Sequence, residues 1–294
     1  MRHPFIRGIS GNGAMRFMVE LLHKITTLLP FEWAQYAFMQ NALLAVIIIA
    51  PLLALLGCIV ITNQMTFFSD AIGHATLSGI ALGAIAGMAD PFWAMIFFAV
   101  LLTLTIELLR RYSSASSDTI IGLVMAFAVA LGVVLLSRGG GFARYSKYLI
   151  GDILTITPPE IGRMLILVIG MIVVWLVLFN SIFLAGMNRS FAISRGQRVW
   201  LTETVFALLV ALVVATTIPW IGLLVINSLL VLPAAAGRNM AHNLTGYVSW
   251  SVAIALASGI AGLIISYYLG TATGATIVLF AFACFVMTLF FRKR

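Results

Sequence analysis

Residues 37–61 read AFMQNALLAVIIIAPLLALLGCIVI, and no charged residue occurs between Trp33 and Ser69. About 20 consecutive apolar residues in a helix are enough to cross the hydrocarbon core of a bilayer. The stretch therefore predicts a membrane-spanning helix over residues 37–61. Pro51 falls near its middle, and a membrane helix tolerates proline when neighbouring groups satisfy the carbonyl that the proline leaves without a donor.

The whole chain shares this apolar character. Of its 294 residues, 62% are hydrophobic and 9% are charged, whereas about 25% of the residues in an ordinary soluble domain are charged. This composition excludes a soluble enzyme, a disordered chain and a nucleic-acid-binding domain. The net charge of +8 comes from 17 Lys and Arg that lie mostly in the tail and short loops, where such residues set orientation and contact anionic headgroups.

Eight further apolar runs follow the first. They predict helices near residues 65–88, 91–109, 118–137, 161–184, 200–217, 220–237, 244–268 and 272–291. The turn signals Ala89-Asp90-Pro91 and Ile218-Pro219-Trp220 separate two of the pairs. We therefore expect an all-α integral membrane protein with about nine transmembrane helices, eight being the alternative count. The membrane domain covers residues 36–291, and residues 1–35 form a tail with a weakly amphipathic surface helix.

Basic residues that flank the spans give an orientation. With the C-terminus in the cytoplasm, the loops 110–117 and 185–199 are cytoplasmic too, and nine spans place the N-terminus outside. The two faces then carry nine and eight Lys or Arg. This difference is small, so the charge rule alone supports the orientation only weakly.

Asp70 and His74 stand at the start of the second span, four residues apart and hence on one helix face. Ionisable groups at membrane depth are costly, so each is a candidate functional group. A carboxylate with an imidazole suits a divalent transition metal such as zinc, manganese or iron. The alternative is that Asp70 caps the helix while His74 bonds to a neighbouring helix.

Other polar and small residues have simpler interpretations. Asp118 begins the fourth span after a serine-rich loop, where helix capping is the default role and metal binding the alternative. Glu107 is a weaker metal candidate, because it can pair with Arg110 or Arg111 one turn away. The glycines that repeat every four residues predict a smooth strip for close helix packing; they are Gly79, Gly83 and Gly87.

Two enzyme signatures are absent from the sequence. It contains no H-E-x-x-H metalloprotease motif and no G-x-x-x-x-G-K-S/T phosphate-binding loop. We therefore expect a transport subunit rather than an enzyme, and any transport driven by ATP needs a second polypeptide.

Four ordered motifs resemble those of the ABC-type manganese/zinc/iron permease family. The first is SDAIGHATLSGIALG over 69–83, the second SDTIIG over 117–122, the third LIGDILTIT over 149–157, and the fourth GLLVINSLLVLPAAAGR over 222–238. Their spacing is compatible with the family along about residues 36–291. The stretch before the first motif lacks the basic residues usual in the family, and the stretch 188–198 is more basic than expected.

The resemblance implies a type II ABC-importer-like permease, multi-pass in the bacterial plasma (inner) membrane. A second permease subunit, identical or paralogous, would pair with it around a central path, with cytoplasmic ATP-binding subunits below and an extracytoplasmic metal-binding protein above. Asp70, His74 and Asp118 would be pathway ligands for a transported zinc, manganese or iron ion, with no permanently bound cofactor. A cytoplasmic coupling segment over 186–199 would include Asn188, Arg189, Phe191, Arg195 and Gly196.

Three alternatives remain open at this point. A proton-coupled secondary transporter would use Asp70 and Asp118 as its carboxylates, and it would work without an ATPase. A permease for a metal chelate such as a siderophore is usually longer and lacks the Asp-x-x-x-His motif. An intramembrane enzyme would use the same metal-binding residue types. Two carboxylates and an imidazole accept zinc, manganese and iron alike, so the residues do not choose the metal.

Overall fold

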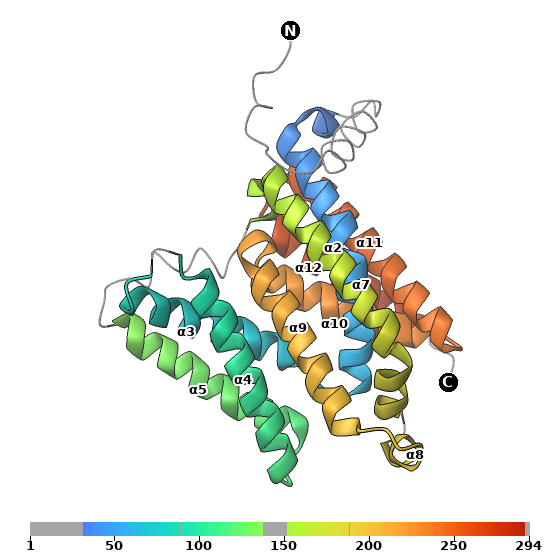
Figure 1. Ribbon diagram of the computed structural model, residues 1–294. Coiled ribbons are helices and arrows are strands. Elements are labelled where there is room, and N and C mark those ends of the chain that lie inside the picture. Colours follow the sequence, from blue (N-terminus) through green and yellow to red (C-terminus); the bar gives the residue numbers. More distant parts are fainter. Residues whose placement is uncertain (1–31, 89, 138–151, 188, 292–294) are drawn as a thin grey trace.

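The computed structural model describes residues 32–88, 90–137, 152–187 and 189–291, which are helical except for short connections (Figure 1). Most of the tail predicted over 1–35 therefore lies outside the described residues. The long helices are α2 (Ala37–Thr62), α3 (Phe68–Ile85), α4 (Phe92–Tyr112), α5 (Ser117–Ser137), α7 (Pro158–Met187), α9 (Val199–Ile221), α10 (Leu223–Met240), α11 (Leu244–Leu269) and α12 (Thr273–Phe290). The short ones are η2 (Glu32–Gln35), η3 (Ile153–Thr155) and α8 (Arg189–Ser194).

A helix forms at each of the nine predicted positions. Eight of the described helices are long and apolar enough to cross a membrane, which confirms an all-α, multi-pass membrane protein. The exception is α3, which has 18 residues but carries Ser69, Asp70 and His74 in its first two turns.

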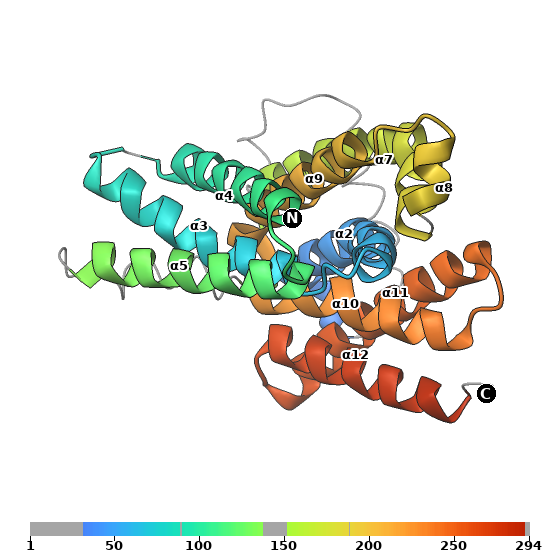
Figure 2. The ribbon, with the colours of Figure 1, turned by 90° about the horizontal axis from the view of Figure 1, so that it is seen from below.

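Helix α2 lies at the centre of the larger group of helices. It packs against α7, α10 and α11, and α10, α11 and α12 pack on one another. Its side chains Ile49, Leu53 and Val60 are fully buried. Helix α3 packs on α4 and α5 to form a second group, and α9 joins the two through contacts with α3 and α4 (Figures 1 and 2).

The directions of successive helices decide which helix ends and connections share one end of the bundle. Helix α3 lies between α4 and α5 (Figure 2), and α3 and α5 run in the same direction with α4 antiparallel to both. Asp70 and Asp118 therefore lie in the first turns of two helices that begin toward the same end of the bundle. The α4–α5 connection, α8 and the end of α12 lie at that end as well (Figure 1). This arrangement agrees with the prediction that residues 110–117 and 185–199 share one face of the membrane with the C-terminal end.

The break between α9 and α10 differs from the predicted one. Helix α9 continues through Pro219 to Ile221, and the chain turns at Gly222, whose φ is +91°. The prediction of a break at Pro219 is therefore wrong by three residues. Proline removes only its own donor and is tolerated within a membrane helix, whereas the left-handed backbone region at position 222 is readily adopted only by glycine.

Glycine allows two of the central helices to touch backbone to backbone. Gly57 of α2 faces the main chain of α10, and a Cβ at position 57 would overlap the carbonyl oxygen of Leu230 and lie 2.8 Å from its carbonyl carbon. Small residues at such interfaces give close van der Waals packing, which drives helix association where lipid tails are as apolar as the side chains.

Candidate metal pathway

Asp70 and His74 lie on one face of α3, as the four-residue spacing predicts. His74 Nε2 is 3.7 Å from Asp70 Oδ1, and each side chain is 34% exposed. Asp70 lies in the first turn of α3 and accepts a hydrogen bond from another helix rather than from a backbone amide at the helix start. The two groups are close enough to share one ion.

Asn227 of α10 joins this pair, and the sequence analysis missed it. Its Nδ2 donates a hydrogen bond to Asp70 Oδ1 at 2.7 Å. The available signal was an amide among the apolar residues near the start of a predicted span, because polar groups at membrane depth usually have a partner or a function. Its Oδ1 is buried and has no hydrogen-bond partner among the described residues.

Gly73 brings α10 to this level of α3. A Cβ at position 73 would overlap the side chain of Leu223, one turn before Asn227 on α10. Because the two helices are antiparallel, Leu223 over Gly73 places Asn227 beside Asp70. Gly73, which lies between Asp70 and His74 in the sequence, therefore allows α10 to come close enough for Asn227 to reach Asp70.

Asp118 is exposed in the first turn of α5. The helix start is capped by Ser116, whose hydroxyl accepts from the Thr119 amide at 3.2 Å and bonds with Thr119 Oγ1 at 2.7 Å. Within the described part of the chain, no three His, Cys, Asp or Glu side chains come together to hold a metal. Within one chain, Asp70 and His74 therefore lie together, whereas Asp118 lies apart from them in the first turn of α5.

Glu107 forms a buried ion pair rather than an open ligand. It is 2% exposed, and Arg110 Nη1 donates to its Oε1 at 2.7 Å. The same guanidinium donates to Ser117 Oγ at 3.2 Å and to Met65 Sδ at 3.5 Å. The pairing anticipated between Glu107 and Arg110 therefore ties the end of α4 to the start of α5 and to the α2–α3 turn.

The three glycines of the predicted packing strip do not share one role. A Cβ at Gly79 would lie 2.8 Å from Met95 Cα, and one at Gly83 would lie 2.9 Å from Ala94 Cβ, so both allow α4 to approach α3. Gly87 has nothing within 4 Å of a Cβ position. Its φ of +72° shows that glycine is needed there for the turn after α3 and not for packing.

Segment 186–199 contains the six-residue helix α8. Asn188 lies outside the described residues, as does the side chain of Arg189. The guanidinium of Arg195 stacks 5.1 Å from the ring centre of Phe191, which is 45% exposed. Gly196 turns the chain toward α9 with a φ of +74°. The result is an exposed aromatic and cationic surface at the end of the bundle predicted to be cytoplasmic.

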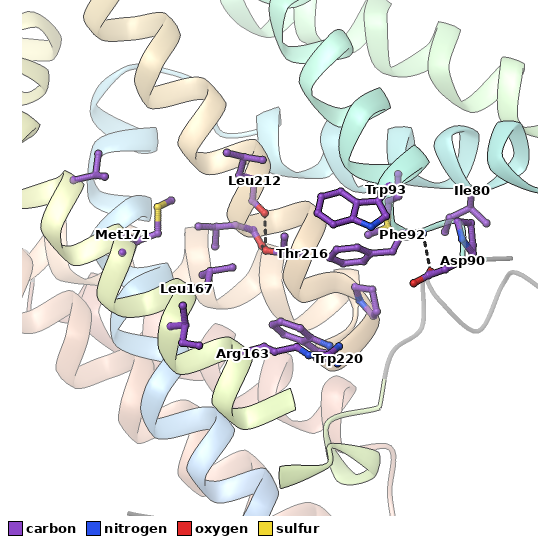
Figure 3. Close-up of a pocket in the computed structure, with 17 residues that line it drawn as sticks. Ile80, Asp90, Phe92, Trp93, Arg163, Leu167, Met171, Leu212, Thr216 and Trp220 are labelled. Carbon is purple, nitrogen blue, oxygen red and sulfur yellow. Dashed lines mark hydrogen bonds between the residues drawn. The ribbon is translucent and has the colours of Figure 1, made fainter. Parts of the chain in front are cut away.

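A cavity of about 820 Å³ lies elsewhere, between α4, α7 and α9 (Figure 3). Its lining is mainly apolar and includes Trp93, Leu167 and Trp220. Two of its polar side chains are already bonded within the chain, Asp90 accepting from the Phe92 amide at 3.0 Å and Thr216 donating to the Leu212 carbonyl at 2.6 Å. This lining contains one carboxylate, Asp90, and no histidine or cysteine, which is too few ligands for a metal site.

Comparisons with known proteins place this chain among membrane transport permeases. Residues 35–292 match the ABC 3 transport family. The high-affinity zinc uptake system membrane protein ZnuB of Haemophilus influenzae is 30% identical over 258 residues, which cover 86% of this chain and 97% of ZnuB. The manganese import system permease protein ScaB of Streptococcus parasanguinis is 30% identical over 260 residues, which cover 88% of this chain and 92% of ScaB.

A solved structure also matches this chain over most of its length. PsaBC from Streptococcus pneumoniae in complex with Fab matches the chain with a TM-score of 0.74 and 26% sequence identity. The match covers 92% of this chain and 95% of the other. Sequence and structure comparisons therefore agree along nearly the whole membrane domain.

Proposed function

The chain belongs to the ABC 3 transport family, and from this premise we propose that it is the membrane permease of an ATP-driven importer of divalent transition metal ions. The observation that carries the proposal is the Asp70–His74 pair, two metal-ligand types 3.7 Å apart in the first two turns of α3. The cargo is a zinc, manganese or iron ion, held only while it passes through the bacterial inner membrane.

Among the described residues of one chain, Asp70 and His74 supply only two neighbouring ligands, too few to enclose such an ion. Zinc binds four ligands in most protein sites, and a site that keeps an open position still uses three. Two copies related by a twofold axis would double the Asp70 and His74 side chains to four. We therefore propose that two permease subunits face each other, with Asp118 near the cytoplasmic mouth of the shared path.

The energy source and the capture of metal belong to partner proteins. An ATP-binding subunit and a substrate-binding protein accompany permeases of this family, and hydrolysis of ATP would occur on the former. The exposed surface of α8, with Phe191 and Arg195, supports a docking role for this segment, since aromatic and arginine side chains dominate many interfaces. Activity without any ATPase would instead favour a proton-coupled secondary transporter.

Substitutions at the pair test the assignment of the pathway. We expect Asp70→Asn and His74→Ala each to lower metal uptake at limiting metal by about tenfold, the equivalent of one lost charge-assisted contact. The measurement is uptake of radiolabelled zinc, manganese and iron by cells that also produce the ATPase and the binding protein. His242→Ala, at an exposed histidine in the α10–α11 turn, is the control. Uptake at the wild-type level in both pathway variants would refute the assignment.

A second prediction concerns the coupling segment. Phe191→Ala and Arg195→Ala should each weaken retention of the ATP-binding subunit by roughly tenfold, because each removes one half of an exposed stacked pair. Co-purification from detergent at increasing salt measures this effect. Arg163→Ala removes an exposed arginine near the opposite end of the bundle and should leave retention unchanged. Equal retention in all three variants would remove α8 from the docking surface.

A further inference from the structure

We infer that Asn227 is a positioning residue for the Asp70 carboxylate and sets how tightly the pathway holds its ion. The inference rests on the proposed role of Asp70 as a pathway ligand. It adds a residue from α10, whereas both members of the predicted pair lie on α3.

The chemistry of the two side chains fixes the direction of the contact. An ionised carboxylate only accepts hydrogen bonds, so the amide must present its NH₂ group to Asp70. The 2.7 Å separation between Nδ2 and Oδ1 is short for such a bond, as expected when the acceptor carries a charge. His74 Nε2 approaches the same oxygen at 3.7 Å.

The two oxygens of the Asp70 carboxylate therefore have different surroundings. Oδ1 is engaged by Asn227 and faces the imidazole, while Oδ2 receives no hydrogen bond from the described residues. An amide that holds one oxygen fixes the plane of the carboxylate and presents the other oxygen to an ion. Partners that orient a ligand in this way usually matter for the affinity of a metal site.

The backbone around Asn227 holds the amide in place. The turn at Gly222 starts α10, and Leu223 packs over Gly73 at the level between Asp70 and His74. The side chain of Asn227 therefore reaches Asp70 from a helix whose height relative to α3 is fixed one turn earlier. Its Oδ1 is buried and lacks a protein partner in the described chain, so the amide meets Asp70 through its NH₂ group alone.

The experiment compares Asn227→Leu, which is similar in size and lacks the donor, with the wild type over a range of metal concentrations. We expect the KM for uptake to rise about tenfold with the maximal rate nearly unchanged, because the affected step is the capture of the ion. Ser228→Ala is the matched control, since the Ser228 hydroxyl donates only to carbonyls of its own helix at 2.9 and 3.1 Å.

A packing role alone would give a different result. It would lower the amount of assembled transporter and the maximal rate without raising the KM, and thermal stability in detergent reports such a loss directly. If Asn227→Leu does not fold, the smaller Asn227→Ala takes its place in the same assay. An unchanged KM in a folded variant overturns the inference. Wild-type uptake by Asp70→Asn would instead contradict the proposed pathway itself, so the two failures are distinguishable.

Discussion

Replacement of Gly57 by alanine is expected to lower the free energy of unfolding by about 3 kcal/mol or more, the largest effect that we predict for a single methyl group. The added Cβ overlaps the carbonyl oxygen of Leu230. Overpacking in a well-packed core usually costs about 1–3 kcal/mol, and the obstacle here is main chain, which cannot move aside as a side chain can. Helices α2 and α10 must therefore separate along the centre of the bundle.

The measurement is the thermal unfolding midpoint of the purified permease in detergent, together with its yield as a monodisperse species. Gly170→Ala is the matched control, because nothing lies within 4 Å of a Cβ at that position of α7. Alanine is the better helix former by about 1 kcal/mol, so the control should be neutral or slightly stabilising. A Gly57→Ala protein as stable as this control would show that α2 and α10 are not packed through Gly57.

Removal of the Glu107 carboxylate is the second large effect. We expect Glu107→Ala to destabilise the permease by about 3–5 kcal/mol, the range found when one partner of a buried ion pair is deleted. The variant leaves the guanidinium of Arg110, which is 15% exposed, without its carboxylate at 2.7 Å. The contacts of Arg110 with Ser117 and Met65 then loosen, and the ends of α4 and α5 lose their common anchor.

Two variants separate this effect from a general loss of charge. Arg111→Ala deletes the adjacent arginine, whose guanidinium stacks 4.9 Å from the ring centre of Trp200, and should cost only about 0.5–1 kcal/mol. The double variant Glu107→Leu/Arg110→Met removes both charges and should regain much of the lost stability, because apolar replacements of a buried pair are often tolerated. A double variant less stable than Glu107→Ala would argue against an electrostatic origin.

Apolar runs and the turn residues between them predicted the helices, and the reason is physical. A membrane helix must satisfy its backbone internally and face lipid with apolar side chains, so each span is visible as a run of such residues. The position of the α9–α10 break was missed because both Pro219 and Gly222 are helix breakers in water. Within the bundle, only the positive φ of Gly222 ends the helix.

The candidate site was only partly predictable. Asp70 and His74 belong to one helix, so their spacing in the sequence already places them on one face. Asn227 lies 157 residues from Asp70 along the chain, and no local pattern connects the two. Gly87 illustrates the same difficulty, because a four-residue repeat describes packing only while the chain is helical, and α3 ends at Ile85.

Helix α3 also bears on how the protein enters the membrane. A segment with a carboxylate and an imidazole in its first two turns gains less from lipid when it leaves the translocation machinery on its own. Its partners α4 and α5 follow it directly in the chain, and α4 covers the side that carries Gly79 and Gly83. We therefore expect α3 to enter the bilayer together with α4 and α5, so that the residues suited to hold an ion reach the membrane as part of a three-helix unit.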